Sequence, residues 1–147
     1  MKLIQKLAAV FLFAFAFNTA TAQMAESKNL IVNKWFIDKE AMKPVIKTML
    51  ATNPQFMGLD EATKESTLGM VMEQISGLRV EYKNDGTMLR NDVNGEVPGT
   101  WSLSADGKEL ITKSEGKPDK KYTLLEITKT KLNLMSSDGK NIILKTE

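Results

Sequence analysis

The chain has 147 residues, of which 42% are hydrophobic, and it carries 20 basic and 18 acidic side chains but neither histidine nor cysteine. The two missing residue types exclude disulfides, thiol chemistry, Ser-His-Asp and Cys-His triads, and metal sites built on histidine. The near-neutral charge, with Arg79 and Arg90 as the two arginines, gives no electrostatic reason to bind nucleic acid. We therefore expect no cofactor and no nucleic-acid partner.

Residues 1–22 have the layout of a secretory signal peptide. Lys2 and Lys6 make a positive start, residues 7–17 form an apolar run too short to span a bilayer, and Ala20-Thr21-Ala22 is a small-residue cleavage site. We expect a mature domain that begins at Gln23, is exported to the periplasm or the extracellular space, and keeps no membrane anchor. The alternative is a retained N-terminal anchor. Loss of the two lysines leaves 18 basic and 18 acidic residues.

The first elements of the mature domain are a lead-in and a strand. Residues 24–29 are polar, which predicts a loose N-terminal segment. Residues 30–37 (LIVNKWFI) are rich in β-branched and aromatic side chains, which favour extended structure. We therefore expect the first strand over residues 30–37.

Two amphipathic helices are predicted next, over residues 39–51 and about 61–76. Asp38 and Asp60 are candidate N-caps, and Gly77 ends the second helix. Apolar residues recur at three- and four-residue spacing, which places them on one helix face. These residues are Met42, Val45, Ile46, Met49 and Leu50 in the first helix, and Leu68, Val71, Met72 and Ile75 in the second.

The rest of the chain is a series of short apolar-alternating runs separated by turn signals. Three of the turns contain Asp-Gly, at residues 85–86, 106–107 and 138–139, and this dipeptide suits the positive φ of tight hairpin turns. Seven further strands are predicted in this region: 78–83, 87–92, 98–104, 108–114, 120–127, 131–136 and 141–146. With the first strand, the total is eight.

The register of the first hairpin depends on its loop length. A two-residue loop at Asp85-Gly86 places Tyr82 opposite Leu89. Leu78 and Val80 then share the inner face with Tyr82. On the opposite, solvent side this register places three charged residues: Arg79, Glu81 and Arg90.

The later hairpins have registers that follow in the same way. We expect two-residue loops at Asp106-Gly107 and at Lys129-Thr130, and a three-residue loop at residues 137–139. Trp101 then lies on the inner face. The facing pairs predicted by these loops are Leu103–Leu110, Ile127–Leu132, Leu125–Leu134, Leu134–Ile142 and Leu132–Leu144.

Eight antiparallel strands with one apolar face can bury that face in a closed barrel or in a two-layer sandwich. Hairpins between nearest neighbours favour the barrel, because a sandwich usually needs crossover connections. We predict a mainly-β fold of one domain over residues 23–147: an eight-stranded antiparallel up-and-down barrel with a two-helix insert, residues 39–77, between strands one and two. The helix pair is long enough to cover an open end of the barrel.

Four short motifs follow one another along the mature chain. They are Asn33-Lys34-Trp35, Asn84-Asp85-Gly86-Thr87, Gly99-Thr100-Trp101, and the hairpin with Leu125 and Ile127 facing Leu132 and Leu134. In this order and spacing, they resemble the secreted bacterial lipocalin-like domain family. The resemblance covers nearly all of the mature chain. It implies a lipocalin-like barrel whose interior carries an apolar ligand, although Asn33 stands where lipocalins have a glycine.

The candidate ligand-binding residues are aromatic and thioether side chains. Large aromatics on the inner face of an eight-stranded barrel either fill it or line a site for one small ligand. Methionines on flexible stems adapt to varied apolar ligands, and packing between helices is the alternative role for them. The predicted site residues are Trp35, Tyr82, Trp101, Tyr122, Met49 and Met72.

Other chemistries have weaker signals. Two Ser-x-x-Lys matches, at residues 114–117 and 137–140, lie on glycine-containing loops rather than on the helix turn that this catalysis needs. Residues 92–96 match a calcium loop only in part. Met70 and Met72 are two apart on a helix, so they point apart, which disfavours a copper site. Four carboxylates fit solvated positions better than a catalytic pair: Glu81, Asp92, Glu96 and Glu126.

The resulting hypothesis is an exported binding protein that is not an enzyme. The eight strands, the helical insert and the abundant methionine predict a barrel that holds a small apolar or amphipathic ligand under a helical lid. The alternative is a barrel filled by its own side chains that makes protein–protein contacts in the cell envelope, which requires an exposed apolar surface.

Overall fold

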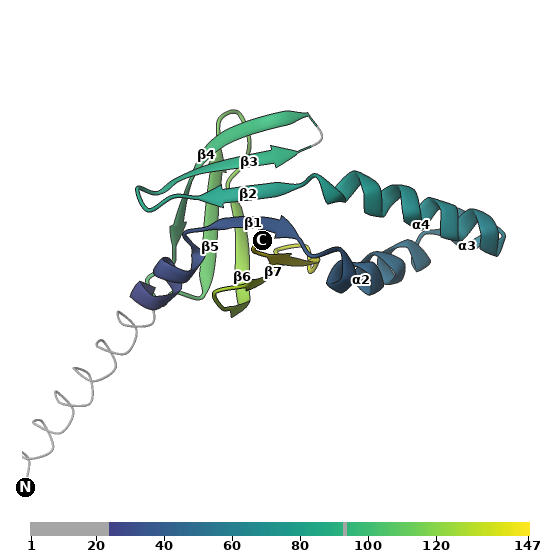
Figure 1. The fold of residues 1–147 in the computed structure, drawn as a ribbon, viewed down its shortest axis with the longest axis horizontal. Helices are drawn as coiled ribbons and strands as arrows, with labels where there is room; N and C mark the ends of the chain where they lie inside the picture. The colour runs from purple at the N-terminus through teal and green to yellow at the C-terminus, as the bar shows by residue number, and fades with distance from the viewer. Residues whose placement is uncertain (1–23, 93) are drawn as a thin grey trace, which may run out of the picture.

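The computed structural model describes residues 24–92 and 94–147, so the predicted signal peptide lies outside the described residues. Within them, eight strands form a closed antiparallel barrel in sequence order, and β8 closes onto β1 (Figure 1). This confirms the predicted fold class. The strands are β1 Lys34–Ile37, β2 Arg79–Tyr82, β3 Thr87–Asp92, β4 Gly95–Leu103, β5 Glu109–Ser114, β6 Lys120–Ile127, β7 Lys131–Ser136 and β8 Asn141–Lys145.

Most predicted registers are confirmed. Leu103 lies opposite Leu110 across β4 and β5, and Ile127 lies opposite Leu132 across β6 and β7. The β7–β8 hairpin has the predicted three-residue loop, since Ser136 N–H donates to Lys140 O at 2.9 Å. It brings Leu132 opposite Leu144 and Leu134 opposite Ile142, as expected. Alternating apolar residues therefore place a single buried face inside the barrel.

The predicted register of the β2–β3 hairpin is wrong by one residue. Tyr82 lies opposite Met88, and Glu81, not Tyr82, lies opposite Leu89. The loop has three residues, 84–86, because Lys83 N–H donates to Thr87 O at 2.9 Å and Gly86 adopts φ +85°. A one-residue slip exchanges the two faces of a strand. Arg90, expected in solvent, is consequently opposite the buried Val80 and faces inward.

A β-bulge in β6 overturns a second predicted pair. Leu124 lies opposite Leu134, and the register shifts between Leu124 and Glu126. The extra residue is Leu125, which we expected to meet Leu134 and which is 45% exposed instead. A bulge places two residues against one and so reverses the alternation beyond it. Ile127 can therefore still face inward, although it is three residues from Leu124.

The N-terminal segment differs from the predicted lead-in and long first strand. Residues 24–31 are helical, and β1 begins only at Lys34. Ile31 is fully buried, and its carbonyl accepts a 2.8 Å hydrogen bond from Trp35 Nε1. Close to Met24, a Cβ built on Gly107 would come within 3.0 Å of Met24 Cα. The segment thus packs against the β4–β5 turn at one end of the barrel (Figure 1).

The insert between β1 and β2 forms a helical arm, which consists of α2 (Lys39–Ala51), α3 (Pro54–Met57) and α4 (Glu61–Ser76). The predicted caps are present: Asp38 accepts a hydrogen bond from Ala41 N, and Asp60 accepts one from Thr63 N. The short α3 was not predicted. Inside the arm, α2 and α4 bury three apolar side chains against each other: Met42, Ile46 and Leu68.

The arm projects away from the barrel (Figure 1), and none of its described residues lines the barrel interior. At its base, Asp38 N–H donates to Ile143 O at 3.0 Å, and Ile143 N–H donates to Met42 Sδ at 3.3 Å. Ile143 is an outward position of β8, because its neighbours Ile142 and Leu144 face the interior. The structure therefore corrects the expectation of a helical lid. None of the helices in the described part of the chain has the length and apolarity of a membrane span.

Gly99 of β4 lies close to β3 and β5, and a substitution at this position tests that packing. A Cβ at this position would lie 2.3 Å from Lys113 O and 2.7 Å from Met88 Cε, so the backbone would have to move. We expect Gly99→Ala to lower the free energy of unfolding by about 1–3 kcal/mol or more. The control is Gly69→Ala in α4, where the added Cβ meets no atom within 4 Å. That substitution should instead stabilise by about 0.5–1 kcal/mol. Urea unfolding measures both, and equal effects would contradict this packing.

The bulge makes a second prediction. Leu124 packs against the barrel core, whereas Leu125 points to solvent. We expect Leu124→Ala to cost about 1–3 kcal/mol and Leu125→Ala to stay within about 0.5 kcal/mol of the parent. Thermal or urea unfolding measures the stability of the two variants. A larger loss for Leu125→Ala than for Leu124→Ala would mean that β6 has no bulge.

Candidate functional site

The barrel interior is filled at the end that the N-terminal helical segment covers. Trp35 is fully buried, and Trp101 is 6% exposed. Their indole N–H groups are satisfied by main-chain carbonyls, Trp35 by Ile31 and Trp101 by Lys83 at 2.9 Å. Tyr82 packs edge-on against Trp101 with ring centroids 5.5 Å apart. This half of the interior is a close-packed floor, because aromatic rings and leucines fill the space that a ligand would need.

The other half of the interior is hollow. A cavity of about 450 Å³ opens at the end where the arm is attached, since its lining includes Ile37 and Asp92 from the ends of β1 and β3. Its floor contains Tyr82 and Met88, which also belong to the core. Small-molecule sites typically occupy ~300–1,000 Å³. The cavity therefore has the size of a binding site for one small molecule.

The two sides of this cavity differ in chemistry. Strands β7, β8, β1 and β2 are neighbours in the barrel and form a mainly apolar wall, to which β2 also contributes the cationic side chain of Arg79. The opposite strands, β3, β5 and β6, form a polar wall. The apolar wall presents Leu134, Ile142, Leu144, Ile37 and Val80. The polar wall presents Arg90, Asp92, Thr112, Lys120 and Tyr122.

Arg90 is the most unusual residue of the polar wall. Its side chain is three-quarters buried, and Nη2 donates to Asp92 Oδ2 at 3.2 Å. Its Nε is buried and has no hydrogen-bond partner within residues 24–92 and 94–147. A buried donor without a partner costs on the order of 1–3 kcal/mol, and more when it is charged. The barrel thus holds a guanidinium whose donors are only partly used.

Asp92 remains a carboxylate beside Arg90. A hydrogen bond from Asn94 N–H, 2.9 Å long, is the main cause that holds the pKa of Asp92 below its usual range. The positive charges of Arg90 and Lys117 act in the same direction. At neutral pH, Asp92 therefore keeps its charge and engages one corner of the guanidinium.

The two tyrosines of the chain both line the cavity. Burial raises the pKa of Tyr82 far above its ordinary value, and it also raises the pKa of Tyr122. Both phenols are consequently protonated at neutral pH. Their hydroxyls remain available as hydrogen-bond donors and acceptors toward the cavity.

A groove lies beside the cavity, between α2 and the strands β6–β8. Its volume is about 990 Å³, and α2 lines it with the apolar side chains of Met42, Val45, Ile46 and Met49. Tyr122 and Ile142 line both the groove and the cavity. The two hollows therefore meet at these residues.

The structure separates the six predicted site residues. Tyr82 and Tyr122 line the cavity, and Met49 lines the groove. Trp35 and Trp101 belong to the filled floor, and Met72 packs in the contact between α2 and α4. Sequence reasoning missed Arg90, because the wrong loop length placed it in solvent. The signal was in the sequence, since residues 84–86 and 137–139 are both polar-Asp-Gly triplets and the second was read as a three-residue loop.

The remaining sequence signals lie in turns. Lys117 N–H donates to Ser114 O at 3.1 Å around Gly116, which adopts φ +68°. In the β7–β8 turn, Asp138 pairs with Lys140 Nζ at 2.6 Å, and the hydrogen bonds from Lys140 and Ser136 lower the pKa of Asp138 to about 2. Within the described residues, no group of three or more acidic side chains gathers to hold a metal ion.

Comparison with known proteins supports the fold and nothing finer. No protein-family model matches the chain, and no curated protein does. A solved structure that is similar is the crystal structure of a DUF4847 family protein from Bacteroides vulgatus ATCC 8482, with a TM-score of 0.53 and 16% sequence identity. The match covers 80% of this chain and 93% of that chain. At this identity, the similarity shows a shared fold alone.

The buried tyrosines predict the behaviour of the protein in alkali. Because the folded state keeps phenol protons that the unfolded state loses near pH 10, stability should fall as the pH rises above about 10. We expect Tyr82 to give no tyrosinate absorbance near pH 10 until the protein unfolds, and Tyr82→Phe should reduce this alkaline loss of stability. The measurements are ultraviolet absorbance and circular dichroism on the same samples. A phenol that ionises near pH 10 in the folded protein would contradict its burial.

Proposed function

We propose that this protein is an exported, lipocalin-like binding protein, not an enzyme, which holds one small apolar or amphipathic ligand in the open half of its barrel. The observation that carries the proposal is the 450 Å³ cavity between an apolar and a polar wall. An eight-stranded barrel interior is wide enough for one small ligand, and here half of it is not filled by side chains. The apolar wall supplies burial, while the polar wall orients the ligand.

Two further features support this proposal. The filled floor, with its satisfied indole groups, is a rigid base that needs no rearrangement on binding. The groove along α2 continues the apolar surface from Ile142 toward Met49, so a ligand longer than the cavity has a place to extend. The signal-peptide layout of residues 1–22 supports export to the periplasm or the extracellular space.

A second function is favoured by one observation on the arm. Met49, Met57 and Met70 are 42%, 57% and 63% exposed, and all three belong to the arm. Exposed methionines on a projecting helix pair suit contact with another protein. In this alternative, the barrel is a scaffold for protein–protein contacts in the cell envelope. It predicts no ligand in the cavity, and crosslinking from position 70 to an envelope protein.

A matched pair of variants tests the binding function. Ile142→Phe adds a ring inside the cavity, and Leu125→Phe adds one to the outer face of the barrel. We expect the wild-type protein to bind the neutral apolar dye Nile red and Ile142→Phe to bind it roughly tenfold more weakly, because the added ring fills space that the dye needs. Leu125→Phe should bind like the wild type. Fluorescence titration of the mature protein measures all three.

The contradicting results are specific. Equal dye affinity in all three proteins would place the dye outside the cavity. The protein purified from its own host can also be examined by native mass spectrometry. If no dye binds and the spectrum shows no bound small molecule, the binding function is wrong and the scaffold function is favoured.

A further inference from the structure

We propose that Arg90 is the anchor for the carboxylate head of an amphiphilic ligand, so that the cavity selects apolar acids over neutral apolar molecules. This inference rests on the proposed function, because it names the chemical class of the ligand in the same cavity. The size and apolarity of the cavity do not distinguish charged from neutral ligands. Arg90 would add this selectivity.

The first argument for this proposal is that the hydrogen-bond donors of Arg90 are only partly used. A guanidinium has five N–H donors in a planar fork that matches a carboxylate, often through two parallel hydrogen bonds. Among the described residues, Asp92 accepts a 3.2 Å bond from Nη2, while Nε is buried without a partner. The Asp92 contact uses Nη2 and leaves the Nε–H of Arg90 without an acceptor. A ligand carboxylate in the cavity that Arg90 lines would accept from guanidinium donors that Asp92 does not use.

The charges around the cavity favour an anion. Four cationic side chains line it, Arg79, Arg90, Lys117 and Lys120, against the single carboxylate of Asp92. The predicted mature domain has equal numbers of basic and acidic residues, so this excess is local. Arg79 is partly neutralised, since Glu96 lies 3.9 Å from its guanidinium on the outer side of the wall. Arg90 faces inward, and the exposed side chains of Lys117 and Lys120 add positive charge that attracts an anion toward the cavity.

Neighbouring hydroxyls can complete the head-group site. Thr112 and Tyr122 lie on the same polar wall as Arg90, and Tyr82 lies on the floor below. The raised pKa values of the two phenols keep them protonated, so they are able to donate hydrogen bonds to an anion. An anion in this position meets a guanidinium and neutral donors, while the two oxygens of Asp92 are already engaged, Oδ1 by Asn94 N–H and Oδ2 by Arg90.

The opposite wall argues for an amphiphile over a small polar anion. Leu134, Ile142 and Leu144 face the polar wall across the cavity, and the groove beyond Ile142 is lined by apolar side chains of α2. Burying a hydrocarbon chain against them strengthens binding with each CH₂ group removed from water, whereas a small acid such as acetate gains none of this. The two walls together therefore fit a carboxylate joined to an apolar chain.

The test compares three probes that separate head from chain: dodecanoate, dodecanol and acetate. Isothermal titration calorimetry at low and physiological salt gives the affinity of the mature protein for each. We expect dodecanoate to bind at least about tenfold more tightly than dodecanol, from the strength of charge-assisted hydrogen bonds. Acetate should show no measurable binding at the same concentrations.

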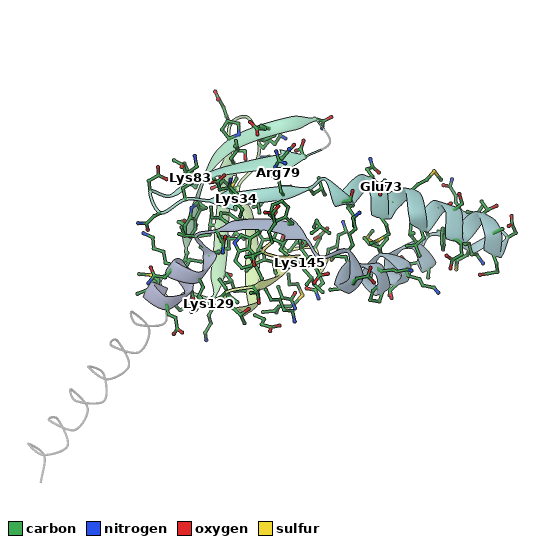
Figure 2. The ribbon with its side chains drawn as sticks, in the orientation of Figure 1. Lys34, Glu73, Arg79, Lys83, Lys129 and Lys145 are labelled. Carbon is green, nitrogen blue, oxygen red and sulfur yellow. The ribbon has the colours of Figure 1, made fainter. Side chains whose placement is uncertain are left out.

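Variants assign this preference to Arg90. Arg90→Gln should bring dodecanoate down to the affinity of dodecanol while leaving dodecanol unchanged. The control is Lys34→Gln, which also removes one positive charge but lies on the outer wall, 3.8 Å from Glu81 (Figure 2). It should keep the full preference. If Arg90→Gln does not fold, as judged by circular dichroism, Arg90→Lys takes its place and should lose part of the preference, because an ammonium lacks the planar fork.

The outcomes distinguish the two proposals. Equal affinities for dodecanoate and dodecanol, or a preference that survives in the Arg90 variant, would overturn the anchor and leave the apolar binding function in place. Acetate that binds as tightly as dodecanoate would overturn the amphiphile and indicate a small-anion site. If neither twelve-carbon probe nor Nile red binds, the anchor and the proposed function fail together.

Discussion

The three-residue turn at residues 84–86 is the constraint on which the interior of the barrel depends. Gly86 adopts φ +85°, and Asp85 Oδ1 accepts hydrogen bonds from Thr87 N at 2.8 Å and Thr87 Oγ1 at 2.6 Å. Across the turn, Gly86 O accepts from Trp101 N–H at 2.8 Å, which ties the turn to β4. Because side chains alternate with a period of two, this loop length decides that Met88 and Arg90 lie inside and Leu89 lies outside.

The barrel that results is asymmetric along its axis. One end has a floor of aromatic rings and leucines under the N-terminal helical segment, and the other end has a hollow with an apolar and a polar wall. The arm leaves the barrel at the hollow end, projects away from it (Figure 1) and packs on the outward residue Ile143, and none of its described residues lines the cavity. The filled half of the interior therefore stabilises the fold, and the hollow half is the candidate binding site. Burial of the Arg90 guanidinium in the hollow half lowers the stability of the protein.

The sequence predicted the architecture because the alternation of apolar residues and the Asp-Gly turns are local signals. The caps Asp38 and Asp60, the bounds of β3 and β7, and the pairs Leu132–Leu144 and Leu134–Ile142 all follow from such signals. The errors occurred where one residue changes the phase of a strand: at the loop of residues 84–86 and at Leu125 in the β6 bulge. Alternation within a strand does not fix the length of the loop that precedes it, and the bulge reverses the alternation inside β6, so a constant period of two located neither insertion. The phase of β3 decides which of its side chains line the polar wall, so the wrong loop length placed Arg90 in solvent and not in the cavity. The helix at residues 24–31 and the direction of the arm depend on tertiary packing, which periodicity does not describe.

The measurement that tests this account most directly is the cross-strand contact pattern of the β2–β3 hairpin by nuclear magnetic resonance. The account predicts nuclear Overhauser effects between Tyr82 and Met88 and between Val80 and Arg90, as facing residues. Contacts that place Tyr82 opposite Leu89, with the Arg90 side chain in solvent, would contradict it, because the polar wall would then lose the residue that defines it.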